Sequence, residues 1–129
     1  MGKIIKINPA TVHPSQDFLK ADTLAFIEGN YNNGFFDKLP PTPIVREDLQ
    51  GGYIAIDGHN LLAFYASLNS ECEVYVAENK SDGLTGDSEM ISKRNKDLYE
   101  KYDAVLSEID RLGEKGIVSI GDLLETISR

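Results

Sequence analysis

The feature that most constrains the fold of this chain is a short apolar strand that runs directly into a glycine turn and then a helix. Residues 53–56 have the sequence Tyr-Ile-Ala-Ile, which is typical of a β-strand, and the turn Gly51-Gly52 precedes them. The segment that follows the strand consists of Asp57, Gly58, His59 and Asn60. A mostly apolar stretch then predicts a helix as far as about Leu68, with Asp57 as its N-cap.

A turn of this kind offers a binding site for an anion. The first N–H groups of the helix have no partner within the helix, and the positive end of the helix dipole lies beside them. Gly58 allows a ligand to approach the backbone, while His59 can bind a phosphate oxygen or move a proton. Asp57 and His59 are therefore the candidate catalytic residues, and Gly58, His59 and Asn60 are candidate ligand-binding residues. The alternative is that Asp57 only caps the helix.

The rest of the first 80 residues predicts an α+β domain with a short mixed sheet. β-branched residues favour strands at 3–7, 44–46 and 73–77. A helix is expected to begin at Pro14-Ser15, with Ser15 as its N-cap, and to stop at Gly29. Residues 30–38 are then predicted to form a loop.

From residue 81 onwards the sequence predicts a linker and a helical C-terminal extension. Residues 78–88 are polar and contain glycine, as mobile loops do. Residues 88–112 are predicted to form one amphipathic helix, ended by Gly113 and Gly116, on the basis of its apolar side chains Leu98, Tyr102, Val105, Leu106, Ile109 and Leu112. Ser119 and Asp122 have the spacing of a capping box and predict a last short helix. The predicted domain division is therefore 1–80 and 81–129.

The composition excludes several kinds of partner. The 129 residues carry 21 acidic and 13 basic side chains, a formal charge of -8, which opposes binding to nucleic acid or to anionic membranes. No apolar run is long enough to span a membrane, and a single cysteine, Cys72, can form no internal disulfide. A cytoplasmic protein is the expectation, with Cys72 as a small buried apolar side chain.

Several of these features together resemble the ParB/sulfiredoxin superfamily domain. The resemblance covers residues 3–80. It rests on the order of elements, on Tyr53-Ile54-Ala55-Ile56-Asp57-Gly58-His59-Asn60, and on Leu39-Pro40-Pro41 before a strand. The stretches Ile7-Asn8-Pro9 and His13-Pro14-Ser15-Gln16 also match the family pattern.

The resemblance implies a nucleotide site at the turn. ParB proteins bind and hydrolyse CTP there, sulfiredoxins use ATP to repair an over-oxidised cysteine, and a related branch phosphorylates free serine. The family turn has the pattern Gly-x-x-Arg, and the arginine position falls on Leu61 in this chain. Leucine cannot supply the fixed cation that holds a phosphate. The catalytic cysteine of sulfiredoxin falls on His59, so the sequence does not support sulfinic-acid reduction.

Other cations are candidates for the role of the missing arginine. Arg46 at the end of one predicted strand and Lys80 after another could approach the site, and His13 could do so if the N-terminal loop folds over it. No metal-ligand spacing is present. The residues do not identify a cofactor. The family fold implies a nucleotide with Mg²⁺, and Asp57, His59 and Glu71 or Glu73 could hold the metal ion.

Two functions from different classes remain. One is a domain that binds a nucleotide or another small anionic ligand at Asp57–Asn60, with or without phosphotransfer or nucleotidase activity. The other is a non-catalytic binding or regulatory module. Such a module would form a homodimer through the C-terminal helix, whose apolar side chains follow a heptad-like 4-3-4-3 spacing. The alternative for that helix is packing on its own domain.

Overall fold

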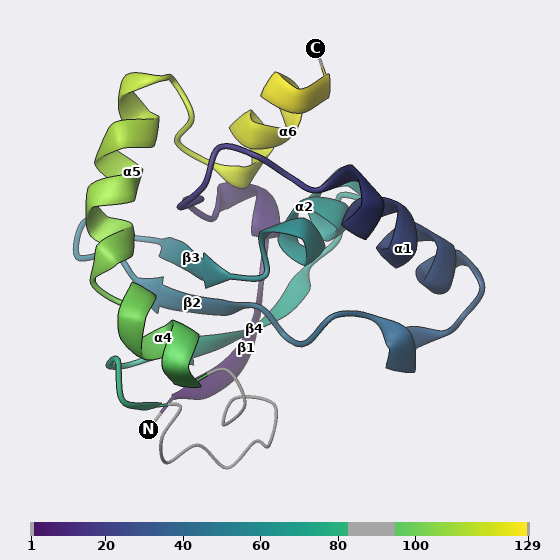
Figure 1. The fold of residues 1–129 in the computed structure, drawn as a ribbon, viewed down its shortest axis with the longest axis horizontal. Coiled ribbons are helices and arrows are strands. Elements are labelled where there is room, and N and C mark those ends of the chain that lie inside the picture. Colours follow the sequence, from purple (N-terminus) through teal and green to yellow (C-terminus); the bar gives the residue numbers. More distant parts are fainter. Residues whose placement is uncertain (1, 83–94, 129) are drawn as a thin grey trace.

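Four strands form one mixed sheet in the order β1-β4-β2-β3, shown in Figure 1. The computed structural model describes residues 2–82 and 95–128. The strands are β1 (Lys3–Ile7), β2 (Ile44–Glu47), β3 (Tyr53–Asp57) and β4 (Cys72–Ala77). The helices are α1 (Ala21–Asn32), α2 (His59–Ser67), α4 (Asn95–Lys101), α5 (Ala104–Glu114) and α6 (Ile120–Ser128), with 3₁₀ turns η1 (Pro9–Thr11) and η2 (Phe36–Lys38). The predicted α+β class, the predicted strands and the helix that follows the glycine turn are confirmed.

Two antiparallel pairs are joined by one parallel pair at the centre of the sheet. β1 pairs with β4 and β2 pairs with β3 in antiparallel fashion, while β2 and β4 run parallel. The outer edge of β3 is covered by the chain at His13, whose N–H donates to the Tyr53 carbonyl and whose carbonyl accepts from the Ala55 N–H, both at 2.8 Å.

Helices pack on both faces of this sheet. On one face, α2 and α6 meet the alternating side chains Cys72, Val74 and Val76 of β4. On the other face, α4 and α5 cover Ile54, Ile56 and Tyr75. The C-terminal helices contribute side chains to both cores, namely Leu98, Val105, Leu112, Ile120 and Leu123. Their packing on the sheet agrees with the alternative that the heptad-like face lies against its own domain.

A third, smaller cluster attaches α1 to α2. Ile27 of α1 packs against Leu61 and Phe64 of α2, and all three are buried. In Figure 1, α1 and the following loop project to one side of the sheet. The beginning of α1 lies beside the beginning of α2, where the Lys20 N–H donates to Oδ1 of Asn60.

Two helix boundaries differ from the prediction. The N-cap of α1 is Lys20 instead of Ser15, because His13 forms a bridge with Ile54 and the Ser15 hydroxyl donates to the Ala55 carbonyl, which attaches this segment to β3. It continues past Gly29 to Asn32, so this glycine lies inside the helix and does not end it.

The long helix predicted at 88–112 is also wrong in its described part. Residues 83–94 lie outside the described residues, and the chain from Asn95 onwards forms two helices that are interrupted at Tyr102 and Asp103. Gly113 lies inside α5, and Gly116, with φ +81°, follows its end. The predicted capping box is confirmed: the Asp122 carboxylate accepts from the Val118 and Ser119 N–H groups, and the Ser119 hydroxyl accepts from the Asp122 N–H.

No helix in residues 2–82 or 95–128 is both long and apolar enough to cross a membrane.

Candidate functional site

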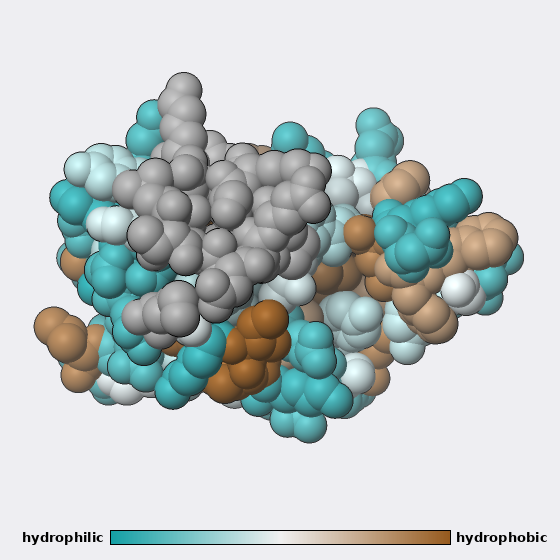
Figure 2. Space-filling model, turned by 90° about the horizontal axis from the view of Figure 1, so that it is seen from below, coloured by the Kyte–Doolittle hydropathy of each residue, from teal (hydrophilic) through white to brown (hydrophobic). Residues whose placement is uncertain are grey.

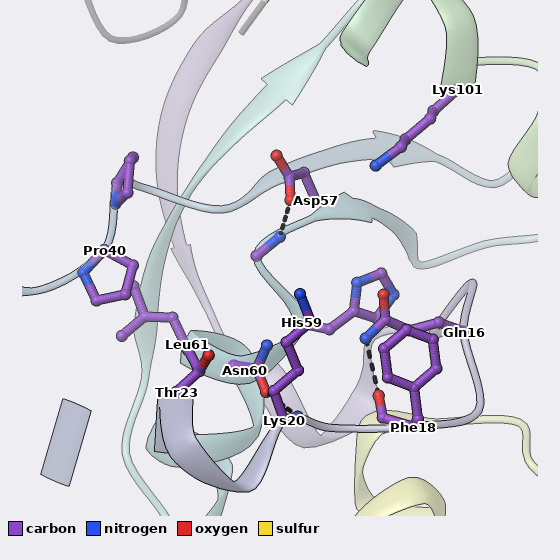
Figure 3. Close-up of a pocket in the computed structure, with 12 residues that line it drawn as sticks. Gln16, Phe18, Lys20, Thr23, Pro40, Asp57, His59, Asn60, Leu61 and Lys101 are labelled. Carbon is purple, nitrogen blue, oxygen red and sulfur yellow. Dashed lines mark hydrogen bonds between the residues drawn. The ribbon is translucent and has the colours of Figure 1, made fainter. Parts of the chain in front are cut away.

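The predicted glycine turn lines a pocket of about 450 Å³, shown in Figure 3. The pocket lies between the beginnings of α1 and α2, the proline-rich segment before β2 and the end of α4. It is lined by Gln16, Phe18, Lys20, Thr23, Pro40, Pro41, Asp57, Gly58, His59, Asn60, Leu61 and Lys101. Its volume falls in the range of small-molecule sites.

Gly58 forms the N-cap of α2 in a conformation that favours glycine. Its φ of +91° lies in the left-handed region, and a Cβ built there would lie 2.7 Å from the Cβ of Pro43. The prediction that Asp57 is the N-cap is wrong, because Asp57 is still paired with Ile44 as the last residue of β3. Since glycine has no side chain, the capping residue cannot accept a hydrogen bond from the first turn of α2, and that turn contains no acidic residue.

His59 is the most buried polar side chain of the site, with 4% of its surface exposed. Its Nε2 accepts a hydrogen bond of 2.9 Å from the backbone N–H of Ser15, so the ring proton is on Nδ1. Burial lowers the pKa of His59 to about 4; the Asp57 carboxylate opposes this shift and the Lys101 ammonium adds to it. The ring is therefore neutral at pH 7, with Nδ1–H as its donor.

Asp57 and Asn60 shape the turn on either side of Gly58 and His59. Oδ1 of Asp57 accepts from the Gly58 N–H at 2.8 Å, which holds the carboxylate at the pocket wall. Oδ1 of Asn60 accepts from the Lys20 N–H at 2.9 Å and so joins the beginning of α2 to the beginning of α1. The structure therefore brings together four of the predicted site residues.

Two lysines that the sequence patterns did not indicate supply positive charge to the pocket. Lys20 lies at the N-cap of α1, and Lys101 is the last residue of α4. Figure 3 shows Lys101 extending from α4 toward Asp57 and His59. No local sequence signal identifies either residue, because each reaches the pocket only through the packing of its helix on the sheet.

The cations suggested from the sequence lie elsewhere. Arg46 does not line the pocket: its guanidinium donates to the Tyr102 carbonyl at 2.8 Å and stacks on the Tyr102 ring at 4.1 Å. Lys80 lies over the ring of Tyr99, and the imidazole of His13 lies 2.8 Å from the Val118 carbonyl and faces Asp48. We therefore withdraw Arg46 as a ligand-binding residue.

Leu61 and Cys72 are both buried side chains that contribute to packing. Leu61 lines the pocket with little exposed surface and packs between α1 and α2. Cys72 is buried, and burial together with the Glu73 carboxylate raises its pKa to about 12. Within the part of the chain that the structure describes, no group of three or more His, Cys, Asp or Glu side chains is arranged to hold a metal ion.

Comparison of the chain with protein-family models, with curated proteins and with solved structures finds no match.

Proposed function

We propose that the pocket at Asp57–Asn60 binds a small ligand with a phosphate or similar anionic group, and that a nucleotide is the ligand class that fits best. The observation that carries the proposal is the convergence of Lys20 and Lys101 on the uncapped N-terminus of α2. Backbone N–H groups and ammonium groups that face one point favour an anion. The imidazole of His59 is neutral at pH 7, and its Nδ1–H adds a further hydrogen-bond donor.

The local charge supports an anion even though the whole chain is acidic. With a formal charge of -8, a phosphate is repelled from most of the surface. Among the lining residues, however, Lys20 and Lys101 face only one carboxylate, that of Asp57. The Asp57 carboxylate could also accept a hydrogen bond from a hydroxyl group of the ligand, or bind a Mg²⁺ ion that accompanies a nucleotide.

One wall of the pocket suits the apolar part of a nucleotide. Phe18 lines the pocket with about half of its surface exposed, and Pro40 and Pro41 lie on the proline-rich wall. Exposed aromatic faces stack on nucleobases. The resemblance to the ParB/sulfiredoxin domain supports the same ligand class. Because Leu61 occupies the position of the family arginine, Lys101 and Lys20 would bind the phosphates in its place.

The geometry favours binding over acid–base catalysis by His59. Nε2 is already occupied by the Ser15 N–H, and a pKa of about 4 makes the ring a weak base. This observation supports the alternative of a binding or regulatory module that does no chemistry. If that module is a dimer, it would need side chains other than Leu98, Val105 and Leu112, which are buried in this chain.

A thermal-shift screen with ATP, CTP, GTP and ADP, each with and without Mg²⁺, tests the proposal. A ligand at a hundred times its Kd should raise the melting temperature by several degrees, since it adds about 2.7 kcal/mol to the free energy of unfolding. Absence of a shift with all four nucleotides would contradict nucleotide binding.

A further inference from the structure

A second pocket, of about 440 Å³, lies on the far side of the proline-rich segment from the first one. It shares Pro40 and Leu61 with the first pocket, but its remaining walls are different. They come from η2, the side of α2 at Tyr65, Lys6 of β1, and residues 71–73 at the beginning of β4. The two pockets therefore offer different chemistry to a ligand.

The wall of the second pocket at η2 is aromatic and exposed. Phe36 lines it with 60% of its surface exposed. Tyr31 holds this ring in an edge contact at 5.5 Å between centroids, and Tyr31 in turn contacts Phe64 and Tyr65. Because the exposed ring belongs to a network of ring contacts, it is held in place before any partner binds, which lowers the cost of binding.

Other phenylalanines outside this pocket are also exposed. Four of the five phenylalanines of the chain have about half or more of their surface exposed: Phe18 precedes α1 and lines the first pocket, while Phe26, Phe35 and Phe36 lie in α1 and the loop that follows it. Figure 2 shows apolar side chains gathered on the side of the molecule where α1 and the following loop lie. Exposed phenylalanines concentrated in one segment indicate an interaction surface that is larger than a single small ligand.

Two carboxylates and one ammonium group line the second pocket. Glu71 and Glu73 line it at the beginning of β4. Lys6 of β1 also lines it and faces Glu73 in the register of β1 and β4, so the lining carries one negative charge in excess. Glu71 is exposed and forms no ion pair with any described residue, so its charge is available to a partner.

We propose that the second pocket is a docking site for a peptide segment of another protein, which places an apolar or aromatic side chain against Phe36 and an adjacent Lys or Arg beside Glu71. Charge complementarity decides among the occupants. A second copy of the chain would bring another charge of -8 to an acidic surface, and an anionic membrane would be repelled in the same way. A basic, apolar peptide matches both the rings and the carboxylates.

Selection from random dodecapeptides displayed on phage tests this proposal with the full chain as target. Enriched sequences should combine an aromatic or aliphatic residue with Lys or Arg. As synthetic peptides they should bind about tenfold or more weakly to F36S and to E71K, which remove the anchor and invert the charge. L49S removes a fully exposed apolar side chain outside the second pocket and should leave Kd unchanged. K101A should also leave it unchanged, because Lys101 does not line the second pocket.

The side chains of Phe36 and Glu71 are largely exposed. F36S and E71K should therefore keep the circular dichroism spectrum and melting temperature of the parent chain. Failure to enrich any peptide, enrichment of acidic peptides, or binding to F36S and E71K as tight as to the parent chain would overturn the proposal. Two further results would also overturn it, because each would show that the pocket binds something other than a peptide. One is a dimer in sedimentation equilibrium that F36S dissociates; the other is binding to phosphatidylserine vesicles that F36S abolishes.

Discussion

The backbone N–H of Ser15 donates a hydrogen bond of 2.9 Å to Nε2 of His59, which joins two residues 44 positions apart in the chain. This bond fixes the tautomer of the imidazole and holds the N-terminal segment over the beginning of α2. The hydroxyl of Ser15 donates to the Ala55 carbonyl at 2.7 Å, so the same residue is attached to β3 as well. The pocket wall is therefore built from segments that are far apart in the sequence.

His59 should make the stability of the protein depend on pH below neutrality. Its pKa is about 4 in the folded chain and near 6.5 when unfolded, so between these values the unfolded state binds the extra proton. The contribution of His59 is fully present above pH 6.5 and is lost as the pH falls toward 4, by about 3 kcal/mol in total. Urea unfolding at pH 7 and pH 5 measures it.

The matched variant for this prediction is H59Q, whose side-chain oxygen can still accept from the Ser15 N–H and does not titrate. Its loss of stability between pH 7 and pH 5 should be smaller than that of the parent chain. An equal loss in both proteins would show that His59 is not the group responsible.

Glycine should be required at position 58 and dispensable at position 29. G58A places a Cβ 2.7 Å from that of Pro43 at a φ of +91°, and we expect it to lower the free energy of unfolding by about 2 kcal/mol or more. G29A meets no atom within 4 Å inside α1 and should raise it by about 0.5–1 kcal/mol. Denaturant titrations of both variants compare the two sites directly. A G58A variant as stable as the parent chain would refute the left-handed turn at this position.

Arg46 should stabilise the junction between α4 and α5. R46M removes the hydrogen bond to the Tyr102 carbonyl and the contact with its ring, and should cost about 1–3 kcal/mol. R111M is the matched control, because the ion pairs of Arg111 with Asp17 and Glu108 are at the surface and should contribute less to stability than the contacts of Arg46. Hydrogen exchange should accelerate in α4 for R46M. Equal effects of the two substitutions would argue against a special role of Arg46.

Cys72 should be unreactive in the folded protein. Burial raises its pKa to about 12, so very little thiolate exists at pH 8. A thiol-specific disulfide reagent should react roughly a hundredfold faster after unfolding in urea, when the pKa returns to about 8.5. Rapid labelling of the native chain would mean that the thiol is accessible.

Local patterns were sufficient to predict the strands, α2 and the capping box of α6. At 53–56 and 73–77 the apolar residues match the burial of the strands, and the Ser119–Asp122 spacing produces the bonds that it predicts. In each case the residues of the sequence pattern are themselves the residues that make the buried contacts or hydrogen bonds in the structure. This is why the glycine turn, and with it Gly58, His59 and Asn60, could be located before the structure was known.

The errors arose where distant contacts decide the local structure. Ser15 is a good N-cap by type, but its hydroxyl donates to the Ala55 carbonyl of β3, and the N-cap of α1 lies five residues later at Lys20. Residues 95–112 have one continuous helical pattern, yet two helices form, and Arg46 from β2 binds the carbonyl at the break. Lys101, the last residue before that break, lines the pocket, and no spacing in the sequence contains this information.

Isothermal titration of the parent chain, K101A and K3A with the nucleotide that gives the largest thermal shift tests the proposed anion site most directly. Lys3 is an exposed lysine on β1 outside the pocket, so K3A removes the same charge elsewhere. We predict that K101A weakens binding about tenfold, while K3A changes Kd by less than about twofold. Equal affinity of the parent chain and K101A, or no binding by the parent chain, would contradict a nucleotide site at this pocket.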